Sequence, residues 1–228
     1  MQQINIEDMV EIAQKLNSVE LDFVFIGGGI IGFLIDDPLA FPVRTTKDID
    51  VVLDVVTDPG QIRLEDKLRL AGFRHDMSDG APSCRWIVDN VTVDILSIKD
   101  KFSGMNMRWL KETVESPLKV NRRGFDLRIA SAPCFIAMKL EAFNDRGKSD
   151  YFGSRDIEDI ISVVDGRSTL IEEITMADKK VKEFISETIN DLMEISDFII
   201  SISGHLLPDP ASQQRKAIVL ERLKKLKK

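Results

Sequence analysis

The chain has 228 residues, a formal net charge of −7, and contents of 43% hydrophobic and 30% charged residues. This composition is typical of a globular protein with a substantial core and excludes a disordered chain. No apolar run approaches the roughly 20 residues of a membrane span, and the N-terminus has neither a basic start nor an apolar signal core. We therefore expect a cytoplasmic protein with no membrane partner, and the net charge argues against indiscriminate coating of nucleic acid.

The first part of the chain predicts a helix, a strand and a glycine turn. Apolar residues at helical spacing indicate a helix over residues 5–17, and a strand is expected at 22–26. Gly27, Gly28 and Gly29 follow, before an apolar helix at 30–36. Glycines let backbone N–H groups approach phosphate, and a helix N-terminus favours negative charge. This turn is therefore a candidate phosphate-binding site.

Two carboxylates begin the next predicted strand, residues 48–55. Asp48 and Asp50 are two residues apart, so their side chains leave the same face, roughly 7 Å apart along the backbone. Two neighbouring like charges are costly unless a cation lies between them, and Mg²⁺ is commonly held by one or two carboxylates plus substrate phosphates. The pair predicts a site for Mg²⁺ or Mn²⁺, with Arg44 and Lys47 delivered to its edge by the preceding loop. Alone, such a pair is also typical of a solvated strand end or an Asx turn.

The middle of the chain supplies a third acidic residue on a strand. A helix from residue 64 ends at Gly72, and residues 83–88 and 91–97 predict a hairpin around Asp89 and Asn90, which suit a tight turn with positive φ. Its second strand carries Asp94 among apolar residues. Two more strands are expected at 114–120 and 125–129, joined at 121–124.

A helix at 133–144, with Ser131 as its cap, carries Lys139 among apolar neighbours. This lysine either extends along the helix to the surface or points into the site, where its ammonium group would meet a triphosphate. A second helix is expected at 154–164. On it, Arg155 and Asp159 have the i,i+4 spacing of a surface pair.

The remainder of the chain predicts helices only. An amphipathic stripe between residues 181 and 199 indicates helix packing. Residues 211–228 carry a net charge of +6 against −13 for the rest of the chain. This basic segment would meet RNA phosphates or an acidic partner, or it would complement a helix C-terminus and keep the end of the chain soluble.

The cysteines and histidines do not form a metal site. Cys84 and Cys134 have no framework or metal-binding spacing, and we expect buried free thiols in a reducing compartment. His75 and His205 are isolated, and each is expected to be a surface or structural residue.

The combination of these motifs resembles a known superfamily. A Gly-Gly turn, Arg44-x-x-Lys47-Asp48-Ile49-Asp50 and a later strand aspartate are similar to the nucleotidyltransferase superfamily of DNA polymerase β. Residues 139–146 and 155–160 resemble the Lys-x-x-Ala-x-x-x-Arg and Arg-Asp-x-x-Asp-Leu elements of its AbiEii-type members, toxin partners of some bacterial toxin–antitoxin pairs. The likeness spans about residues 22–165. It leaves open which two of the three glycines form the usual pair.

The resemblance implies an α+β nucleotidyltransferase fold, with a small mixed β-sheet flanked by helices in residues 1–130 and a helical region in residues 131–228. It also implies transfer of a nucleoside monophosphate from a nucleoside triphosphate to an acceptor hydroxyl. The implied metal ligands are Asp48, Asp50 and Asp94. Besides these three acids, the implied catalytic residues are Lys139 and Asp156, and the implied triphosphate contacts are Gly27, Gly28, Gly29, Arg44, Lys47 and Lys139.

By the same resemblance the acceptor would be a tRNA 3′ end, and the protein would have a cognate antitoxin. Two alternatives use the same core. One is a small-molecule nucleotidyltransferase of the aminoglycoside-modifying kind, and the other is a non-catalytic nucleotide-binding module.

Overall fold

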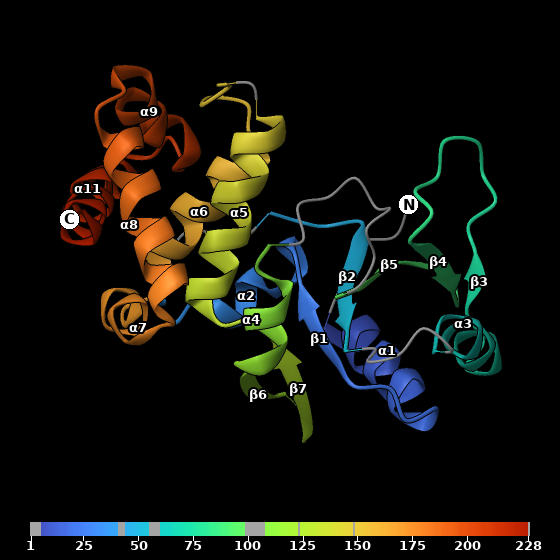
Figure 1. Ribbon diagram of the computed structural model, residues 1–228. Coiled ribbons are helices and arrows are strands. Elements are labelled where there is room, and N and C mark those ends of the chain that lie inside the picture. The colour runs from blue at the N-terminus through green and yellow to red at the C-terminus, as the bar shows by residue number, and fades with distance from the viewer. Residues whose placement is uncertain are drawn as a thin grey trace. The chain divides into compact units, whose positions relative to one another are not determined.

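The computed structural model describes residues 6–40, 44–54, 60–98, 108–122, 124–147 and 149–227, without the side chains of 60–63. The chain forms two compact units, a strand unit (residues 1–30 and 44–130) and a helical unit (residues 31–43 and 131–228) (Figure 1). The chain therefore passes between the units three times, at 30/31, 43/44 and 130/131. No helix of the described part is long and apolar enough to cross a membrane.

The strand unit is built on one mixed sheet with the strand order β3-β4-β5-β2-β1-β7-β6. Its strands are β1 (Phe23–Ile26), β2 (Asp48–Leu53), β3 (Arg74–His75), β4 (Arg85–Val88), β5 (Val91–Ser97), β6 (Leu118–Arg122) and β7 (Phe125–Ile129). The pairs β2–β5 and β1–β7 are parallel and the others are antiparallel. The central strands β1, β2 and β5 are mostly buried because they are nearly continuous runs of apolar residues.

Helices complete the strand unit. They are α1 (Ile6–Ser18), the 3-10 helix η1 (Gly28–Ile30), α3 (Gly60–Leu70) and α4 (Leu110–Glu115). The apolar face of α1 buries Met9, Ile12 and Leu16, which confirms the predicted N-terminal helix. Helix α1 contacts β7, and α4 contacts β1 and β2.

Most predicted boundaries are confirmed, and one strand is wrong at its start. Val114 was expected to begin a strand but lies in α4, because Leu110 and Val114 are buried at the i,i+4 spacing of a helix. The strand β6 begins at Leu118, after Pro117. The predicted loop and turn residues 41–43, 55–59 and Arg123 lie outside the described residues.

The predicted helix at 30–36 is shorter than expected. It consists of η1 and the four-residue α2 (Ile31–Leu34), and α2 belongs to the helical unit. Beyond it, the backbone N–H groups of Asp36 and Asp37 both donate to the carbonyl of Gly166, at 3.0 Å each. These bonds replace those that would continue the helix.

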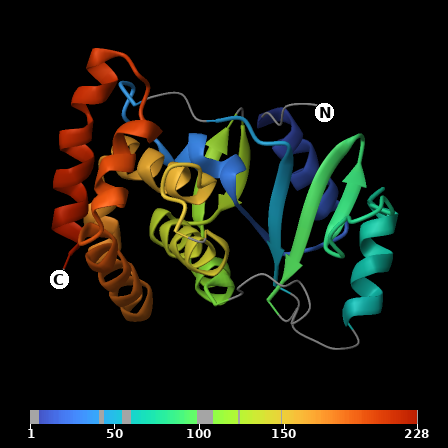
Figure 2. The ribbon, with the colours of Figure 1, turned by 90° about the horizontal axis from the view of Figure 1, so that it is seen from above.

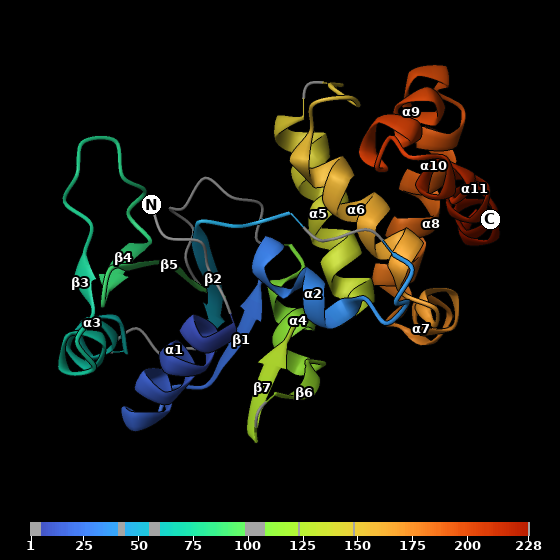
Figure 3. The same ribbon diagram turned by 180° about the vertical axis from the view of Figure 1, so that it is seen from behind.

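Besides α2, the helices of the helical unit are α5 (Ala132–Arg146), α6 (Arg155–Gly166), α7 (Leu170–Met176), α8 (Lys179–Met193), α9 (Ser196–Ser201), η2 (Ile202–His205), α10 (Pro210–Gln214) and α11 (Lys216–Leu226). Helix α5 packs against α6 and α8, and α11 packs against the same two helices (Figure 3). The predicted apolar stripe is buried along α8 at Val181, Ile185, Ile189 and Leu192. Ser131 is at the N-cap of α5 as predicted, but its side chain accepts no capping hydrogen bond.

Candidate active site

The three acidic residues predicted from the strands share one face of the sheet. Asp50 and Asp94 are register partners in the parallel pair β2–β5, and Asp48 lies two residues earlier on β2. Register partners project to the same face, as do residues two apart on one strand. Figure 2 shows β2, β5 and β4 side by side. The sheet therefore brings Asp48, Asp50 and Asp94 together, although they come from two separate parts of the sequence.

Arg85 joins this row from the next strand. It is the register partner of Asp94 in the β4–β5 hairpin. Its Nε donates to Asp94 Oδ1 at 2.8 Å and its Nη2 to Asp94 Oδ2 at 2.7 Å, which makes a bidentate pair. The same Nη2 lies 3.5 Å from Asp48 Oδ2. The hydrogen bond to Asp94 raises the pKa of the Arg85 guanidinium, so Arg85 remains charged at every working pH.

The glycine turn lies directly against the Asp50 carboxylate. A Cβ added at Gly27 would be 1.9 Å from Asp50 Oδ2, and the φ of +72° there also favours glycine. At Gly28 a Cβ would lie 2.7 Å from Arg44 Nη2, whereas at Gly29 the nearest atom is an ordinary 3.7 Å away. The close approach therefore requires glycine at position 27, whereas a side chain at position 28 would displace the end of the Arg44 side chain.

The predicted cations of the loop before β2 differ in exposure. The Arg44 guanidinium packs against Gly28, and Arg44 is half-buried. Lys47 is exposed. Arg44 is thus brought to the glycine turn by contacts within the strand unit, while Lys47 remains in solvent.

The strand row is a partial match to the metal site that the fold family implies. Asp48 is 41% exposed and Asp50 is half-buried on the same face, so both present the hard oxygen ligands that Mg²⁺ prefers. Asp94 is only 6% exposed and its two oxygens accept from Arg85. Within the part of the chain that the structure describes, no group of three metal-ligating side chains is arranged to hold an ion. Asp48 and Asp50 fit a metal, and Asp94 is engaged elsewhere.

The other two predicted residues, Lys139 and Asp156, form an ion pair inside the helical unit. Lys139 Nζ lies 3.1 Å from Asp156 Oδ1 and 2.7 Å from Asp159 Oδ2. Arg146 donates to both Asp156 oxygens at 3.0 Å. Burial works to raise the pKa of Asp156, but the hydrogen bond from Arg146 and the charges of Lys139 and Arg146 outweigh it, so this pKa is lowered. Because Asp159 is fully buried and pairs with Lys139, the surface-pair interpretation is wrong.

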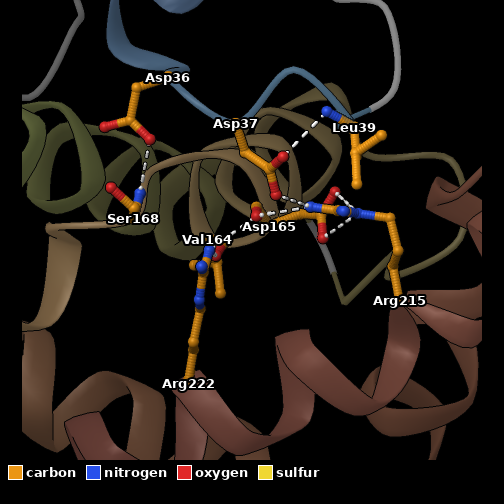
Figure 4. Close-up of polar contacts among 8 residues, drawn as sticks. All are labelled: Asp36, Asp37, Leu39, Val164, Asp165, Ser168, Arg215 and Arg222. Carbon is orange, nitrogen blue, oxygen red and sulfur yellow. Dashed lines mark hydrogen bonds and ion pairs between the residues drawn. The ribbon is translucent and has the colours of Figure 1, made fainter.

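The basic C-terminal segment is largely occupied by internal contacts. Arg215 Nε donates to both Asp165 oxygens at 2.8 Å, and its Nη2 donates to Asp37 Oδ2 at 2.7 Å (Figure 4). Arg222 donates to the carbonyls of Val164 and Asp165 at 2.7 and 2.6 Å. Lys225 and Lys227 pair with Glu221 and Glu194, each at 2.8 Å or less. Much of the +6 charge is therefore engaged by this unit's own acceptors.

The burial predicted for the two cysteines and the structural contacts predicted for the two histidines are confirmed. Cys84 and Cys134 are buried free thiols, and burial, reinforced by the charge of Asp94, raises the pKa of Cys84 to about 11. His205 is buried and its Nε2 lies 2.7 Å from the carbonyl of Tyr151, while His75 stacks on Trp86 with 3.7 Å between ring centroids.

Sequence reasoning missed Arg85, although a signal was present. A two-residue turn at Asp89 and Asn90 makes Val88 and Val91 partners, and counting outward from them places Arg85 opposite Asp94. The positive φ angles of 46° and 67° at the two turn residues confirm this turn. The partners of Arg215 carry no comparable signal because they are 50 and 178 residues away.

Comparisons with known proteins support the fold. The chain is similar to the crystal structure of an antigenic nucleotidyltransferase-like protein from Paracoccidioides brasiliensis, with a TM-score of 0.53 and 20% identity over 89% of this chain and 95% of that chain. It is also similar to the antibiotic-resistance factor ANT(2″)-Ia (TM-score 0.47, 14% identity, 82% and 95% covered) and to the lincosamide antibiotic adenylyltransferase LnuA (TM-score 0.44, 13% identity, 71% and 98% covered).

No family model and no curated protein matches the chain. The likeness to the first structure and the mixed, helix-flanked sheet agree with each other. The predicted fold is confirmed, and the chain has the nucleotidyltransferase fold.

Proposed function

We propose that this protein is a divalent-metal-dependent nucleotidyltransferase, which transfers a nucleoside monophosphate from a nucleoside triphosphate to an acceptor hydroxyl and releases pyrophosphate. The observation that carries the proposal is the Asp48–Asp50 pair on one sheet face, with the Asp50 carboxylate against the Gly27 backbone. Carboxylates beside a glycine turn bring metal ligands and phosphate-binding backbone to one place. The nucleotidyltransferase fold supports the same reading.

Within the strand unit, we assign metal binding to Asp48 and Asp50. A bound Mg²⁺ or Mn²⁺ would neutralise charge that develops on the phosphates. Backbone groups of Gly27, Gly28 and Gly29 would line the triphosphate, because glycines let backbone N–H groups approach phosphate. Because α2 has only four residues, a helix dipole contributes little here. Arg44 and Lys47 would supply positive charge to the triphosphate.

In the helical unit, the resemblance implies roles for Lys139 and Asp156, and we propose that Lys139 contacts nucleotide and that Asp156 is catalytic. Lys139 is held between two aspartates and Asp156 is held by Arg146, so both side chains have a fixed position.

The acceptor is the least constrained part of the proposal. The sequence resemblance to AbiEii-type proteins favours a tRNA 3′ end and a protein antitoxin as partner. The internal contacts of Arg215 and Arg222 work against this, because they remove charge that RNA phosphates would meet. This observation favours the second candidate, a small-molecule acceptor with a hydroxyl group.

The test is incubation of the full chain with each α-labelled nucleoside triphosphate, Mg²⁺, and either total RNA or a panel of hydroxylated small molecules. We expect Mg²⁺-dependent label in one acceptor class. The loss of a metal ligand removes several kcal/mol of transition-state stabilisation, so Asp50→Asn should lower the rate on the order of 10³-fold. Asp54→Asn, an exposed residue just after the same strand, is the matched control and should retain the rate. Full Mg²⁺-dependent activity in Asp50→Asn would contradict the assignment.

A further inference from the structure

The Arg85–Asp94 pair has a consequence for the metal site. Arg85 and Asp94 are register partners, and so are Asp94 and Asp50, so the three residues form a row across β4, β5 and β2. In the sequence, Asp94 is the predicted third metal ligand. In the structure, both of its oxygens face the guanidinium of Arg85.

We propose that Arg85 holds Asp94 out of metal ligation, so that the strand face binds one divalent cation through Asp48 and Asp50. Arg85 then acts as a positioning residue. Its positive charge lies beside Asp94, the carboxylate that would attract a second ion if it were a third metal ligand. This inference rests on the proposed function and deepens its metal assignment.

The burial of the pair gives the reason that a cation would not displace Arg85. The Asp94 side chain is 6% exposed and the Arg85 side chain is 26% exposed, so the two hydrogen bonds between them are mostly shielded from water. Breaking one partner from a buried pair leaves an uncompensated charge, which is strongly unfavourable. Asp48 is different, because it is 41% exposed and contacts Arg85 only at 3.5 Å. A metal can therefore reach Asp48 without breaking the Arg85–Asp94 pair.

The geometry also gives Arg85 a second effect. Arg85 Nη2 lies 2.7 Å from Asp94 Oδ2 and 3.5 Å from Asp48 Oδ2. The guanidinium therefore attracts the Asp48 carboxylate toward the Asp94 side of the row. Its positive charge also weakens the attraction of the row for any divalent ion, since like charges repel across these short distances.

The experiment is a Mn²⁺ titration of the full chain followed by electron paramagnetic resonance, which counts free Mn²⁺ and so gives the number and affinity of bound ions. Four proteins are compared: wild type, Asp94→Asn, Arg85→Met, and the double variant Arg85→Met/Asp94→Asn. We expect one Mn²⁺ per wild-type chain. Asp94→Asn should still bind one Mn²⁺ but more weakly than wild type, because it leaves the positive charge of Arg85 unbalanced beside Asp48.

Arg85→Met should bind Mn²⁺ at least about tenfold more tightly, because one adjacent positive charge is lost and Asp94 is released. The double variant should return to near wild-type affinity, since it lacks both members of the pair. Because Arg85→Met leaves a buried carboxylate unpaired and folding has to be checked, the double variant, which leaves neither charge unpaired, provides the independent arm.

A tenfold or greater loss of Mn²⁺ affinity in the double variant, or unchanged affinity in folded Arg85→Met, would overturn the inference. If wild type still transfers nucleotides in either case, the proposed function stands and only the role of Arg85 falls. If no variant binds Mn²⁺, the inference and the metal assignment fall together.

Discussion

Two clusters of acidic and basic residues, one in each unit, contain the same residue types but differ in how far they are exposed to solvent. In the helical unit, the Arg215 side chain is about 10% exposed and the Asp165 side chain is 0% exposed. Arg215 forms ion pairs with Asp165 and with Asp37. In the strand unit, Arg85 lies 2.7 Å from Asp94 but 3.5 Å from Asp48, whose side chain is 41% exposed. One cluster is closed to solvent, and the other leaves a carboxylate accessible.

The pKa values of the closed cluster follow from this burial. Burial raises the pKa of Asp165 even though Arg215 hydrogen bonds to it, whereas the hydrogen bond from Arg215 lowers the pKa of the more exposed Asp37. Charge that is buried and fully paired holds segments together, here the segment around Asp37 and the C-terminal helices (Figure 4). Accessible carboxylates on a rigid strand can instead bind an ion.

The largest effect that the comparison predicts is on stability, in the closed cluster. Arg215→Met removes the partner of a fully buried carboxylate, so the free energy of unfolding should fall by about 3–5 kcal/mol. Lys225→Met, on the same C-terminal segment with a 57% exposed side chain, should remain close to wild type. Urea denaturation of both variants measures the difference. Equal stability of the two variants would mean that the closed cluster does not hold the unit together.

The next effect concerns Lys139, which belongs to a buried network and is also proposed to contact nucleotide. Lys139→Ala should weaken triphosphate binding by about 1.5–3 kcal/mol, the value of a charge-assisted contact. Arg146→Met is the control from the same network, because Arg146 pairs with Asp156 but its side chain is 62% exposed. Calorimetric titration with nucleotide, performed on variants shown to be folded, separates the roles. A purely structural lysine would leave the affinity unchanged in both variants.

The sequence predicted the elements whose signal is local. The glycine turn, the strand at Asp48 and the hairpin at Asp89 and Asn90 depend on neighbouring residues, and all three are present. The predicted grouping of Asp48, Asp50 and Asp94 on one face followed from a motif resemblance, and the register of β2 with β5 supports it.

The remainder depends on contacts between distant residues. Val114 belonged to a helical spacing that its apolar neighbours concealed. The sequence does not reveal that Arg215 is paired, because its partners Asp37 and Asp165 are far away in the sequence. Pairing of a charge with a distant buried acid leaves no periodic pattern, so composition alone overstated the positive surface.

The central claim is that the strand carboxylates bind a metal–nucleotide complex, and ligand-dependent thermal stability tests it most directly. Unfolding temperatures are measured with Mg²⁺ and a non-hydrolysable nucleoside triphosphate analogue at ten times its dissociation constant. A ligand at that concentration stabilises by about 1.4 kcal/mol, or roughly 3–6 °C for a chain of this size. We predict this shift in wild type and in Asp54→Asn, and no shift in Asp50→Asn. An equal shift in Asp50→Asn would contradict the claim.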